Sequence, residues 1–526
     1  MRNKLLVIVL LFFGCVGLHA QTVNWATDIA PILYKNCTEC HREAGLGHFS
    51  LIGYGNAFSR RFSIQDKTSA RQMPPWKPDP TYQRYAHENR LTDAEIQLIS
   101  SWVDAGAPAG DLSQAPPDPV FTQSSAVGEP DHFLTTPLFT VTATEDEYRC
   151  FVIPNGLSQT AYLRGLEAIP GNHEVVHHIL IYEDTTGHAR DLDDQTPEAG
   201  YVNFGGPGVQ GARLIGAWVP GSRTVLMPPF MGIKLTPGAD LIVQMHYPEG
   251  VTGMSDMTTL NFFFTPTTQD IREVNLAPLL NHTPFSLENW PLFIPANGVK
   301  TYHAKFNVPL QGSAISVAPH MHLIGRSITC FGITPLGDTL RMIRINDWDF
   351  HWQGSYTFQK VMRIPSGTML HAYATYDNTT DNPFQPNDPP QNVWQGEATT
   401  DEMMLVYFAY MAYQPGDENI VLDSTLLTTN TLQPVENDVI QNVVIAPNPV
   451  RDQLNAQFDL AESTKLHLCI IDQEGKIVQT RDEREPIGSG AHRVQIDVSA
   501  LPPGSYYLEI QGARASVAGQ RFIKIR

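Results

Sequence analysis

Proline and glycine interrupt this chain so often that long helices are excluded over most of its length. The 526 residues include 40 prolines and 39 glycines, and 42% are hydrophobic whereas only 17% are charged. Short apolar runs between such breakers are typical of β-strands. The sequence therefore predicts a globular, loop-rich and mainly β protein, and its length allows three or four domains at roughly 150 residues each.

The segment 1–20 has the layout of a secretory signal peptide. Arg2 and Lys4 precede a short apolar run, and the mature chain is predicted to begin at Gln21. Lipidation of Cys15 is an alternative for this segment. No later run reaches the roughly 18 apolar residues that a membrane-spanning helix needs. We therefore expect a protein that is secreted or held at the outer cell surface after export through the periplasm, with no transmembrane span.

Charge and cysteine content exclude two further classes of protein. The formal net charge of −19 offers no basic surface for phosphates, so we expect no nucleic-acid partner. The cysteines that follow the signal peptide are too few for a disulfide framework in a chain of this length. They are Cys37, Cys40, Cys150, Cys330 and Cys469.

Residues 37–41, Cys-Thr-Glu-Cys-His, form the attachment motif of c-type haem. In this motif two thiols, here those of Cys37 and Cys40, bind the haem vinyl groups, and the histidine, here His41, takes one axial position of the iron. A redox Cys-x-x-Cys pair or an ordinary surface turn is the alternative. Haem is attached outside the cytoplasm, which agrees with export. One haem c per chain is therefore expected.

Helical patterns flank this motif. Apolar residues at helical spacing precede it within 25–36, and Thr92 and Glu95 form a capping box at the start of a second helix. Met73 offers a thioether as second axial ligand. It could instead fill a gap in the haem pocket, with His48 or His87 as ligand.

The stretch 24–110 resembles a monohaem cytochrome c domain of the kind fused to larger exported enzymes, through "ILYKNCTECHR", "MPPWKPD" and "LTDAEIQLISSWVDAGAP". The resemblance implies a small all-α cytochrome c-like haem domain over 21–113. The proline-rich 114–127 is then a linker.

The segment GNHEVVHHILIY at 171–182 admits two interpretations. His173 to His177 spell HExxH, the motif of a zinc-hydrolase helix. However, Pro170-Gly171 lies just upstream, and the β-branched residues that follow favour extended structure. The second interpretation is a strand that carries the adjacent pair His177 and His178. Side chains alternate along a regular strand, so convergence of this pair on one ion requires a bulge or a strong twist.

Further metal-ligand residues occur in strand-like runs downstream. His246 lies in IVQMHY, and His320 and His322 stand two residues apart, on one face of a strand. Met403 and Met404 follow an acidic pair in another such run. Two imidazoles with a thioether favour copper, especially Cu(I), and hence redox chemistry. Any one of these residues alone would more often be structural, as we expect for His173, His188, His282, His303, His351 and His371.

The order HH, QMHY, HMH, DEM, at intervals of roughly 70 to 80 residues, resembles the copper type II, ascorbate-dependent monooxygenases, the family of the peptide-amidating and dopamine-hydroxylating enzymes. The resemblance covers about 128–430. It implies two tandem β-sandwich domains, 128–270 and 271–432, with one copper on each, two per chain. By this resemblance His177, His178 and His246 hold the electron-transfer copper. The oxygen-activating copper is held by His320, His322 and Met403, because the family ligand directly follows the acidic pair. Gln244 and Tyr407 also match family positions near the metals.

The sequence departs from peptide-amidating members at two positions. Their arginine before HxH and their asparagine after the methionine grip a peptide carboxylate, and here Ala318 and Leu405 stand there. Loss of both argues against a glycine-extended peptide as substrate. Most of the family's disulfides are missing as well, and Cys150 and Cys330 are the only candidates for one bridge.

Residues 443–526 read as short strands separated by turns, which predicts a small Ig-like β-sandwich. The pieces "PNP", "DQEGKIV" and "LPPGSYYLEI" resemble the type A C-terminal sorting domain of type IX secretion, whose machinery would be a partner. A plain accessory module is the alternative.

Together these features predict an exported copper-dependent monooxygenase that uses O₂ to hydroxylate a C–H bond of an unidentified small organic substrate. Family members take electrons from ascorbate. The fused haem would instead supply them within one molecule, after reduction by an external donor. A non-catalytic haem or copper electron carrier and an HExxH zinc hydrolase are the alternatives.

Overall fold

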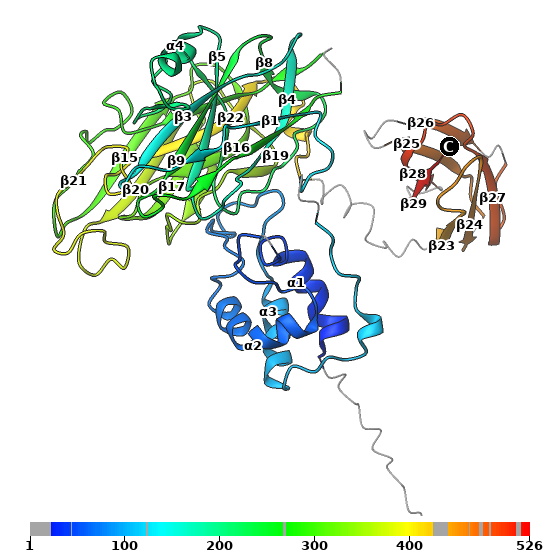
Figure 1. The fold of residues 1–526 in the computed structure, drawn as a ribbon. Helices are drawn as coiled ribbons and strands as arrows, with labels where there is room; N and C mark the ends of the chain where they lie inside the picture. Colours follow the sequence, from blue (N-terminus) through cyan, green and yellow to red (C-terminus); the bar gives the residue numbers. More distant parts are fainter. Residues whose placement is uncertain are drawn as a thin grey trace, which may run out of the picture.

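The computed structural model describes residues 23–43, 45–121, 125–266, 270–423, 440–461, 463–472, 477–482, 485–511 and 517–525. The predicted signal peptide lies outside them. A small helical domain, two β-sandwiches and a C-terminal β-domain follow one another along the chain (Figure 1). The described part is mainly β, as predicted, and none of its helices is long and apolar enough to cross a membrane.

The helical domain is built from η1 (Trp25–Ile29), α1 (Ala30–Asn36), α2 (Tyr54–Ser69), α3 (Asp93–Asp104) and η2 (Leu112–Gln114). The predicted capping box forms: the Thr92 side chain accepts from the Glu95 backbone N–H, and the Glu95 carboxylate accepts from that of Thr92. Trp25 and Trp102 are both buried in the apolar core that these helices share. Cys37 lies directly after α1, so the Cys-x-x-Cys-His motif forms the loop that follows the first helix.

The first sandwich consists of two five-stranded sheets. One has the order β6 (Tyr201–Val202), β3 (Glu147–Pro154), β9 (Asp240–Tyr247), β5 (His178–Asp184), β7 (Arg213–Trp218). The other has the order β1 (His132–Thr135), β11 (Thr259–Phe264), β4 (Ala161–Ile169), β8 (Met231–Leu235), β12 (Arg272–Glu273). Short strands β2 (Phe139–Thr140) and β10 (Ser255–Asp256) pair beside them, and α4 (His188–Asp194) follows β5.

The second sandwich pairs two four-stranded sheets. One has the order β13 (Asn275–Leu280), β22 (Leu405–Ala412), β16 (Gly312–His320), β19 (Tyr356–Ile364). The other has the order β15 (Val299–Asn307), β20 (Met369–Asp377), β17 (Gly325–Ile333), β18 (Thr339–Ile345). Strands β14 (Phe293–Ile294) and β21 (Val393–Trp394) pair outside these sheets, and η3 (Asp417–Asn419) follows β22.

The two sandwiches share an apolar core. Residues of β16, β19 and β22 are buried in the same cluster as the interior of the first sandwich, namely Ile315, Val361, Ala409 and Met411. Burial of apolar side chains on both sides of an interface favours a fixed relative position. The sandwiches therefore form one continuous unit.

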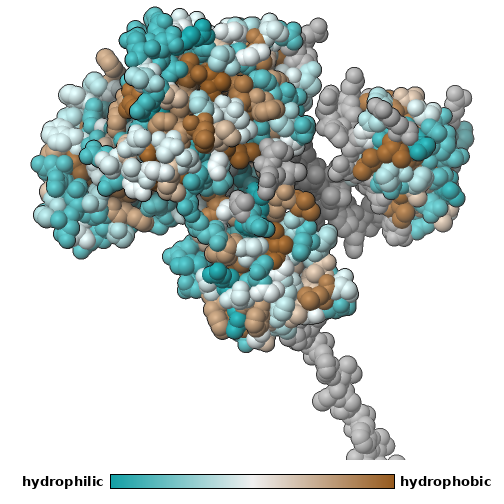
Figure 2. Space-filling view, viewed as in Figure 1, coloured by the Kyte–Doolittle hydropathy of each residue, from teal (hydrophilic) through white to brown (hydrophobic). Residues whose placement is uncertain are grey.

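The helical domain is joined to the second sandwich by residues 74–90, here called the docking segment. Pro78 bridges to Ile345 and Tyr85 bridges to Phe358 in strand-like pairs. Tyr85 is buried in the core of the second sandwich, and its hydroxyl donates to the Met342 carbonyl oxygen at 2.6 Å. The space-filling view shows the helical domain in contact with the sandwiches (Figure 2). Contact between the helical domain and the second sandwich therefore does not depend on the linker alone.

The C-terminal domain has its own apolar core and two sheets. One sheet contains β23 (Ile440–Ala446), β24 (Gln453–Leu460) and β27 (Gly490–Asp497). The other contains β26 (Ile477–Asp482), β25 (His467–Asp472), β28 (Gly504–Gln511) and β29 (Val517–Lys524). Cys469 is buried there, as expected for a core residue.

The other cysteines do not form the one bridge that the sequence left open. Cys150 in β3 and Cys330 in β17 are both free and buried. They belong to cores of different sandwiches, which keeps them from pairing.

Candidate metal centres

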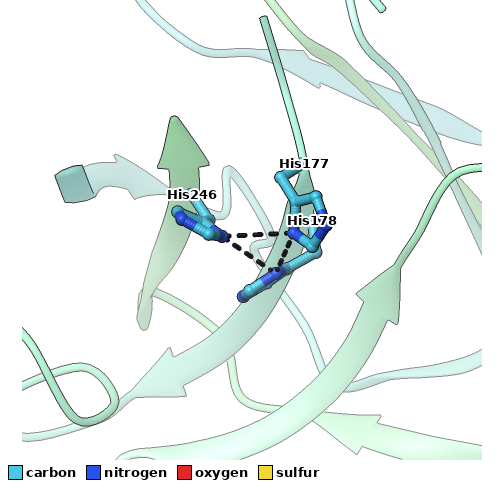
Figure 3. Close-up of side chains that lie close together, drawn as sticks. All are labelled: His177, His178 and His246. Carbon is cyan, nitrogen blue, oxygen red and sulfur yellow. Dashed lines mark hydrogen bonds between the residues drawn. The ribbon is translucent and has the colours of Figure 1, made fainter. Parts of the chain in front are cut away.

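Three histidines of the first sandwich bring one ring nitrogen each to a common point (Figure 3). The Nδ1 atoms of His177 and His178 lie 3.1 Å apart, and the Nδ1 atom of His246 lies 3.2 and 3.3 Å from them. A triangle of this size has a point about 2 Å from every corner, the usual distance from an imidazole nitrogen to a metal ion. Among the described residues, these three form a group able to hold a metal ion.

The local backbone explains how adjacent histidines converge. His178 is the first residue of β5 and pairs directly with His246 of β9. His177 precedes the strand, where its backbone N–H donates to the His246 carbonyl oxygen at 2.9 Å. Because His177 lies outside the strand, the alternation of side chains that would separate the rings of His177 and His178 does not apply. Residues 173–175 form a turn, so the helix that an HExxH zinc site requires is not there.

Side chains beside this site hold His246 in place. The ring of Tyr148 stacks on that of His246 with centroids 4.3 Å apart. The Asp146 carboxylate lies 3.7 Å from Nε2 of His246, the nitrogen that faces away from the other two rings. A carboxylate behind a histidine fixes the ring and raises its basicity toward a metal.

Burial keeps the candidate ligands neutral. It lowers the pKa of His177 to about 3, assisted by the charge of His246, and lowers the pKa of His178 well below 6.5. For the same reason the pKa of His320 falls to about 4 and that of His322 well below 6.5. Metal binding requires unprotonated imidazole, so these four rings are ready to bind an ion near neutral pH.

The second site lies at the end of β16. His320 is the last residue of the strand and His322 lies in the turn that follows, with ring centroids 5.1 Å apart. The Nδ1 atom of His320 contacts Oε1 of Gln353 at 2.5 Å, and that of His322 contacts the Asp401 carbonyl oxygen at 3.1 Å. These contacts occupy Nδ1 on both rings and leave Nε2 for a metal ion.

The sequence suggested that Met403 and Met404 lie within a strand. In the structure both precede β22. Met403 lines the cavity that contains both histidines of the second site, whereas Met404 is buried in the apolar core of the sandwich. Glu402, which is fully buried, ties this segment to the histidine turn. Its carboxylate accepts from the backbone N–H groups of His322, Ile324 and Met403.

One cavity of about 340 Å³ reaches both sites. His178 of the first site and His320, His322 and Met403 of the second line it. Gln244 and Tyr407 line it as well, and burial raises the pKa of Tyr407 to about 12, so this phenol stays protonated. Ala318 and Leu405 stand in its wall, and among the described residues that line it Glu397 is the one with a charged side chain.

An aromatic ring connects the two sites. Phe350 is buried, its ring stacks on that of His177 at 4.7 Å, and it meets the ring of His322 edge-on at 5.6 Å. The two candidate centres are therefore separated by one side chain at this point.

The histidine of the Cys-x-x-Cys-His loop is closely packed. His41 stacks on Phe49 at 4.4 Å, and any side chain at Gly47 would overlap the His41 ring. Burial raises the pKa of Cys37 to about 12 and also raises that of Cys40, so both stay as thiols until they react. The half-buried Met73 has no contact with His41 among the described interactions.

Comparison with known proteins gives two family matches. Residues 297–425 match the family model "Copper type II ascorbate-dependent monooxygenase, C-terminal domain", and residues 444–525 match "Secretion system C-terminal sorting domain". The chain is copper monooxygenase-like in its second sandwich. The sorting domain indicates export to the cell surface or the medium and the secretion machinery as a partner. No curated protein matches the chain.

Solved structures add little to this. A duf3244 family protein from Bacteroides vulgatus with an immunoglobulin-like β-sandwich is 18% identical, covering 16% of this chain and 99% of that one, with a TM-score of 0.12. A β-glucuronidase from Faecalibacterium prausnitzii is 13% identical, covering 44% of this chain and 38% of that one, with a TM-score of 0.13. These TM-scores are too low to support an argument.

Several residues around the sites were not found from the sequence. Asp146, Tyr148, Phe350 and Gln353 contact candidate ligands and Thr399 contacts Asp146, but none of them lies in a metal-binding motif. His282, expected to be structural, lines the cavity, and its Nδ1 accepts from the Met404 backbone N–H at 3.2 Å. A contact made by a loop far away in the sequence leaves no local pattern that could predict it.

Proposed function

We propose that this protein is an exported copper-dependent monooxygenase that hydroxylates a C–H bond with O₂. The observation that carries the proposal is the convergence of His177, His178 and His246 beside a second site, whose sandwich matches the C-terminal domain of the copper monooxygenase family over residues 297–425. His177, His178 and His246 would hold the electron-transfer copper. The oxygen-activating copper would be held by His320, His322 and Met403, a donor set that favours Cu(I). Bound copper would supply the one-electron and O₂ chemistry of the reaction.

The chain's own residues orient the ligands and enclose the substrate. Asp146, Gln353 and the Asp401 carbonyl oxygen each face the ring nitrogen that is turned away from the metal. The cavity between the sites is lined mainly by apolar and aromatic side chains, which limit access of water during the reaction.

The cavity also bears on the substrate. Ala318 and Leu405 provide no donor for a carboxylate, and Glu397 would repel one. Burial raises the pKa of Glu397, assisted by the charge of Asp401. A small organic molecule without a carboxylate at this end fits such a cavity.

We further propose that haem bound at Cys37, Cys40 and His41, with Met73 as the candidate second axial ligand, supplies electrons to the copper at His177. A cavity of about 650 Å³ is lined by Leu46 and His48 of the haem-motif loop and by His177 itself. Between them, the Glu39 carboxylate pairs with Arg223 of the first sandwich at 2.5 Å. This arrangement supports delivery within one molecule, after reduction by an external donor.

Metal analysis of the purified mature protein tests the proposal first. We expect two copper ions and one haem iron per chain, with one copper lost in His178→Ala and one in His322→Ala. One tightly bound zinc in place of copper would contradict it. O₂ consumption that His322→Ala leaves unchanged would indicate a non-catalytic carrier.

The haem supply is tested separately. Haem is reduced beforehand and mixed anaerobically with no other acceptor, in copper-loaded and copper-free protein. Oxidation of the haem in the copper-loaded sample alone is expected, at a rate independent of protein concentration. Equal rates in the two samples would exclude the relay and leave the copper proposal standing.

A further inference from the structure

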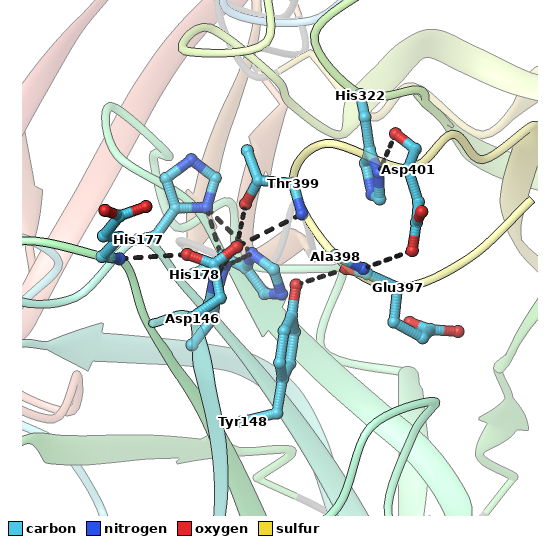
Figure 4. Close-up of polar contacts among 11 residues, drawn as sticks. Asp146, Tyr148, His177, His178, His322, Glu397, Ala398, Thr399 and Asp401 are labelled. Atoms are coloured by element: carbon cyan, nitrogen blue, oxygen red, sulfur yellow. Dashed lines mark hydrogen bonds and ion pairs between the residues drawn. The ribbon is translucent and has the colours of Figure 1, made fainter. Parts of the chain in front are cut away.

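We infer that Asp146 and Thr399 are positioning residues whose contact couples the two candidate metal sites, so that metal binding at one raises the affinity of the other. The inference rests on the proposed function, because it takes both sites to bind copper. Asp146 belongs to the first sandwich and lies beside the histidines of its site, whereas Thr399 belongs to a loop of the second sandwich in which Asp401 contacts His322 (Figure 4).

On the side of the first sandwich, Asp146 is held by several donors. The Thr399 hydroxyl donates to its Oδ2 at 2.6 Å and the Thr399 backbone N–H at 3.2 Å, while the Glu249 backbone N–H donates to Oδ1 at 3.0 Å. The same Oδ2 lies 3.7 Å from Nε2 of His246. Thr399 therefore helps to fix the carboxylate that stands behind a ligand of the other sandwich.

On the side of the second sandwich, Thr399 lies in a short loop that leads to Met403. The Asp401 carbonyl oxygen in this loop contacts Nδ1 of His322, and the Asp401 carboxylate accepts from the Ala398 backbone N–H at 3.3 Å. Tyr148, which stacks on His246, donates its hydroxyl to the Glu397 carbonyl oxygen at 2.8 Å. Both ends of the loop are thus tied to the first site or to the second.

These contacts connect the loop to both candidate sites. An ion at the first site orders His246 and, through Asp146, the loop at Thr399. An ordered loop places the Asp401 carbonyl oxygen and Met403 for the second site, and less ordering remains to be done when the second ion binds. Linkage requires the reverse effect to have the same size. The apolar interface between the sandwiches involves other residues, so it does not replace this contact.

The test is a competition titration of the metal-free protein with Cu(I) and a chromophoric chelator under anaerobic conditions. His320→Ala leaves the first site alone and His178→Ala leaves the second. We expect each site to bind Cu(I) more tightly in the intact protein than in its single-site variant. Thr399→Val should reduce this difference and weaken the first site, by less than the roughly tenfold to hundredfold loss that follows removal of the partner directly behind a metal ligand.

Two further variants make the result decisive. Thr399→Ser keeps the hydroxyl and should restore both affinity and coupling. Thr375→Val removes a comparable hydroxyl contact, that of Thr375 with Thr301 at 2.9 Å on an exposed sheet face, and should change neither. Thermal unfolding of the metal-free variants checks that each one folds.

The outcomes separate the two proposals. If the intact protein binds two copper ions with affinities equal to those of the single-site variants, or if Thr399→Val keeps the coupling of the wild type, coupling through Asp146 and Thr399 is refuted and the monooxygenase proposal stands. If the intact protein does not bind two copper ions, the proposed function itself fails.

Discussion

At the scale of single residues, the two neighbouring methionines before β22 have different surroundings although their sequence context is nearly the same. Met403 faces the cavity with His320 and His322, whereas Met404 is fully buried in the core of the second sandwich. The sequence favoured Met403 only through a resemblance to a family pattern. Side-chain direction, which an irregular segment does not encode in a simple period, separates the two in the structure.

Exchange of each methionine for alanine should therefore affect a different property, Cu(I) affinity for Met403 and stability for Met404. Met403→Ala is expected to weaken Cu(I) binding at the second site while changing stability little, because its thioether is proposed as a ligand. Met404→Ala should cost about 2 to 5 kcal/mol of unfolding free energy, as for a buried methionine, and leave Cu(I) affinity close to wild type. Chelator competition and denaturant unfolding measure the two quantities. Weaker Cu(I) binding in Met404→Ala alone would reverse the assignment.

Glu402 should make stability depend on pH. Burial raises its pKa to about 8, against the effect of four backbone N–H donors, whereas its ordinary value is 4.5. Between these pH values the folded chain keeps a proton that the unfolded chain has lost. The stability supplied by this proton is complete below pH 4.5 and is lost as the pH rises through about 8.

Glu402→Gln has no such proton, so its unfolding free energy relative to wild type should increase with pH, by at most about 1.4 kcal/mol per pH unit. Urea unfolding of metal-free protein between about pH 5 and 8 measures this difference. Glu288→Gln, at an exposed ion pair with Lys305, is the control and should show no trend in this range. A constant difference for Glu402→Gln would contradict the argument.

At the scale of elements, local patterns predicted what local interactions determine. The capping box at Thr92 and Glu95 formed, and the segment around His178 and that around His246 became neighbouring strands. The ends of these strands were harder to predict. His177, His322 and Met403 all lie just outside a strand, in irregular segments, and the segment at His322 is held by Glu402, which is distant in the sequence. Motif spacing could therefore name the ligands, but not the contacts that orient them.

The docking segment gives a prediction at this scale. Tyr85 buries its ring in the second sandwich and donates to the Met342 carbonyl oxygen, although it comes from the helical domain. Tyr85→Ala should lower the unfolding free energy of the second sandwich by about 3 to 5 kcal/mol, as for other large buried rings. Tyr85→Phe keeps the ring and should cost only about 1 to 3 kcal/mol for the carbonyl left without its donor.

Calorimetry of the three proteins gives the order of their transitions. We expect the wild type to unfold at the highest temperature, Tyr85→Phe next and Tyr85→Ala at the lowest. Identical transitions would show that the docking segment is not part of the second sandwich in solution.

At the scale of the whole molecule, the structure adds a connection that the sequence did not predict. Proline-rich residues after Gln114 suggested a tether between an independent haem domain and the copper domains. The docking segment instead adds strand-like pairs to the second sandwich, and Glu39 pairs with Arg223 of the first sandwich. The helical domain is therefore held against the sandwiches by contacts that do not depend on the covalent linker.

Cleavage of the linker should leave the two parts together. A protease site inserted after Gln114 can be cut in the folded protein, and the helical domain is expected to elute with the sandwiches in gel filtration because the docking segment remains buried. Haem oxidation by the copper-loaded part should then keep a rate that is independent of protein concentration. The same cut in Tyr85→Ala should release the helical domain and make that rate fall on dilution, as for any reaction between separate molecules. Release of the helical domain from the cut wild type would mean that the linker alone joins the domains, and that electron delivery depends on the tether.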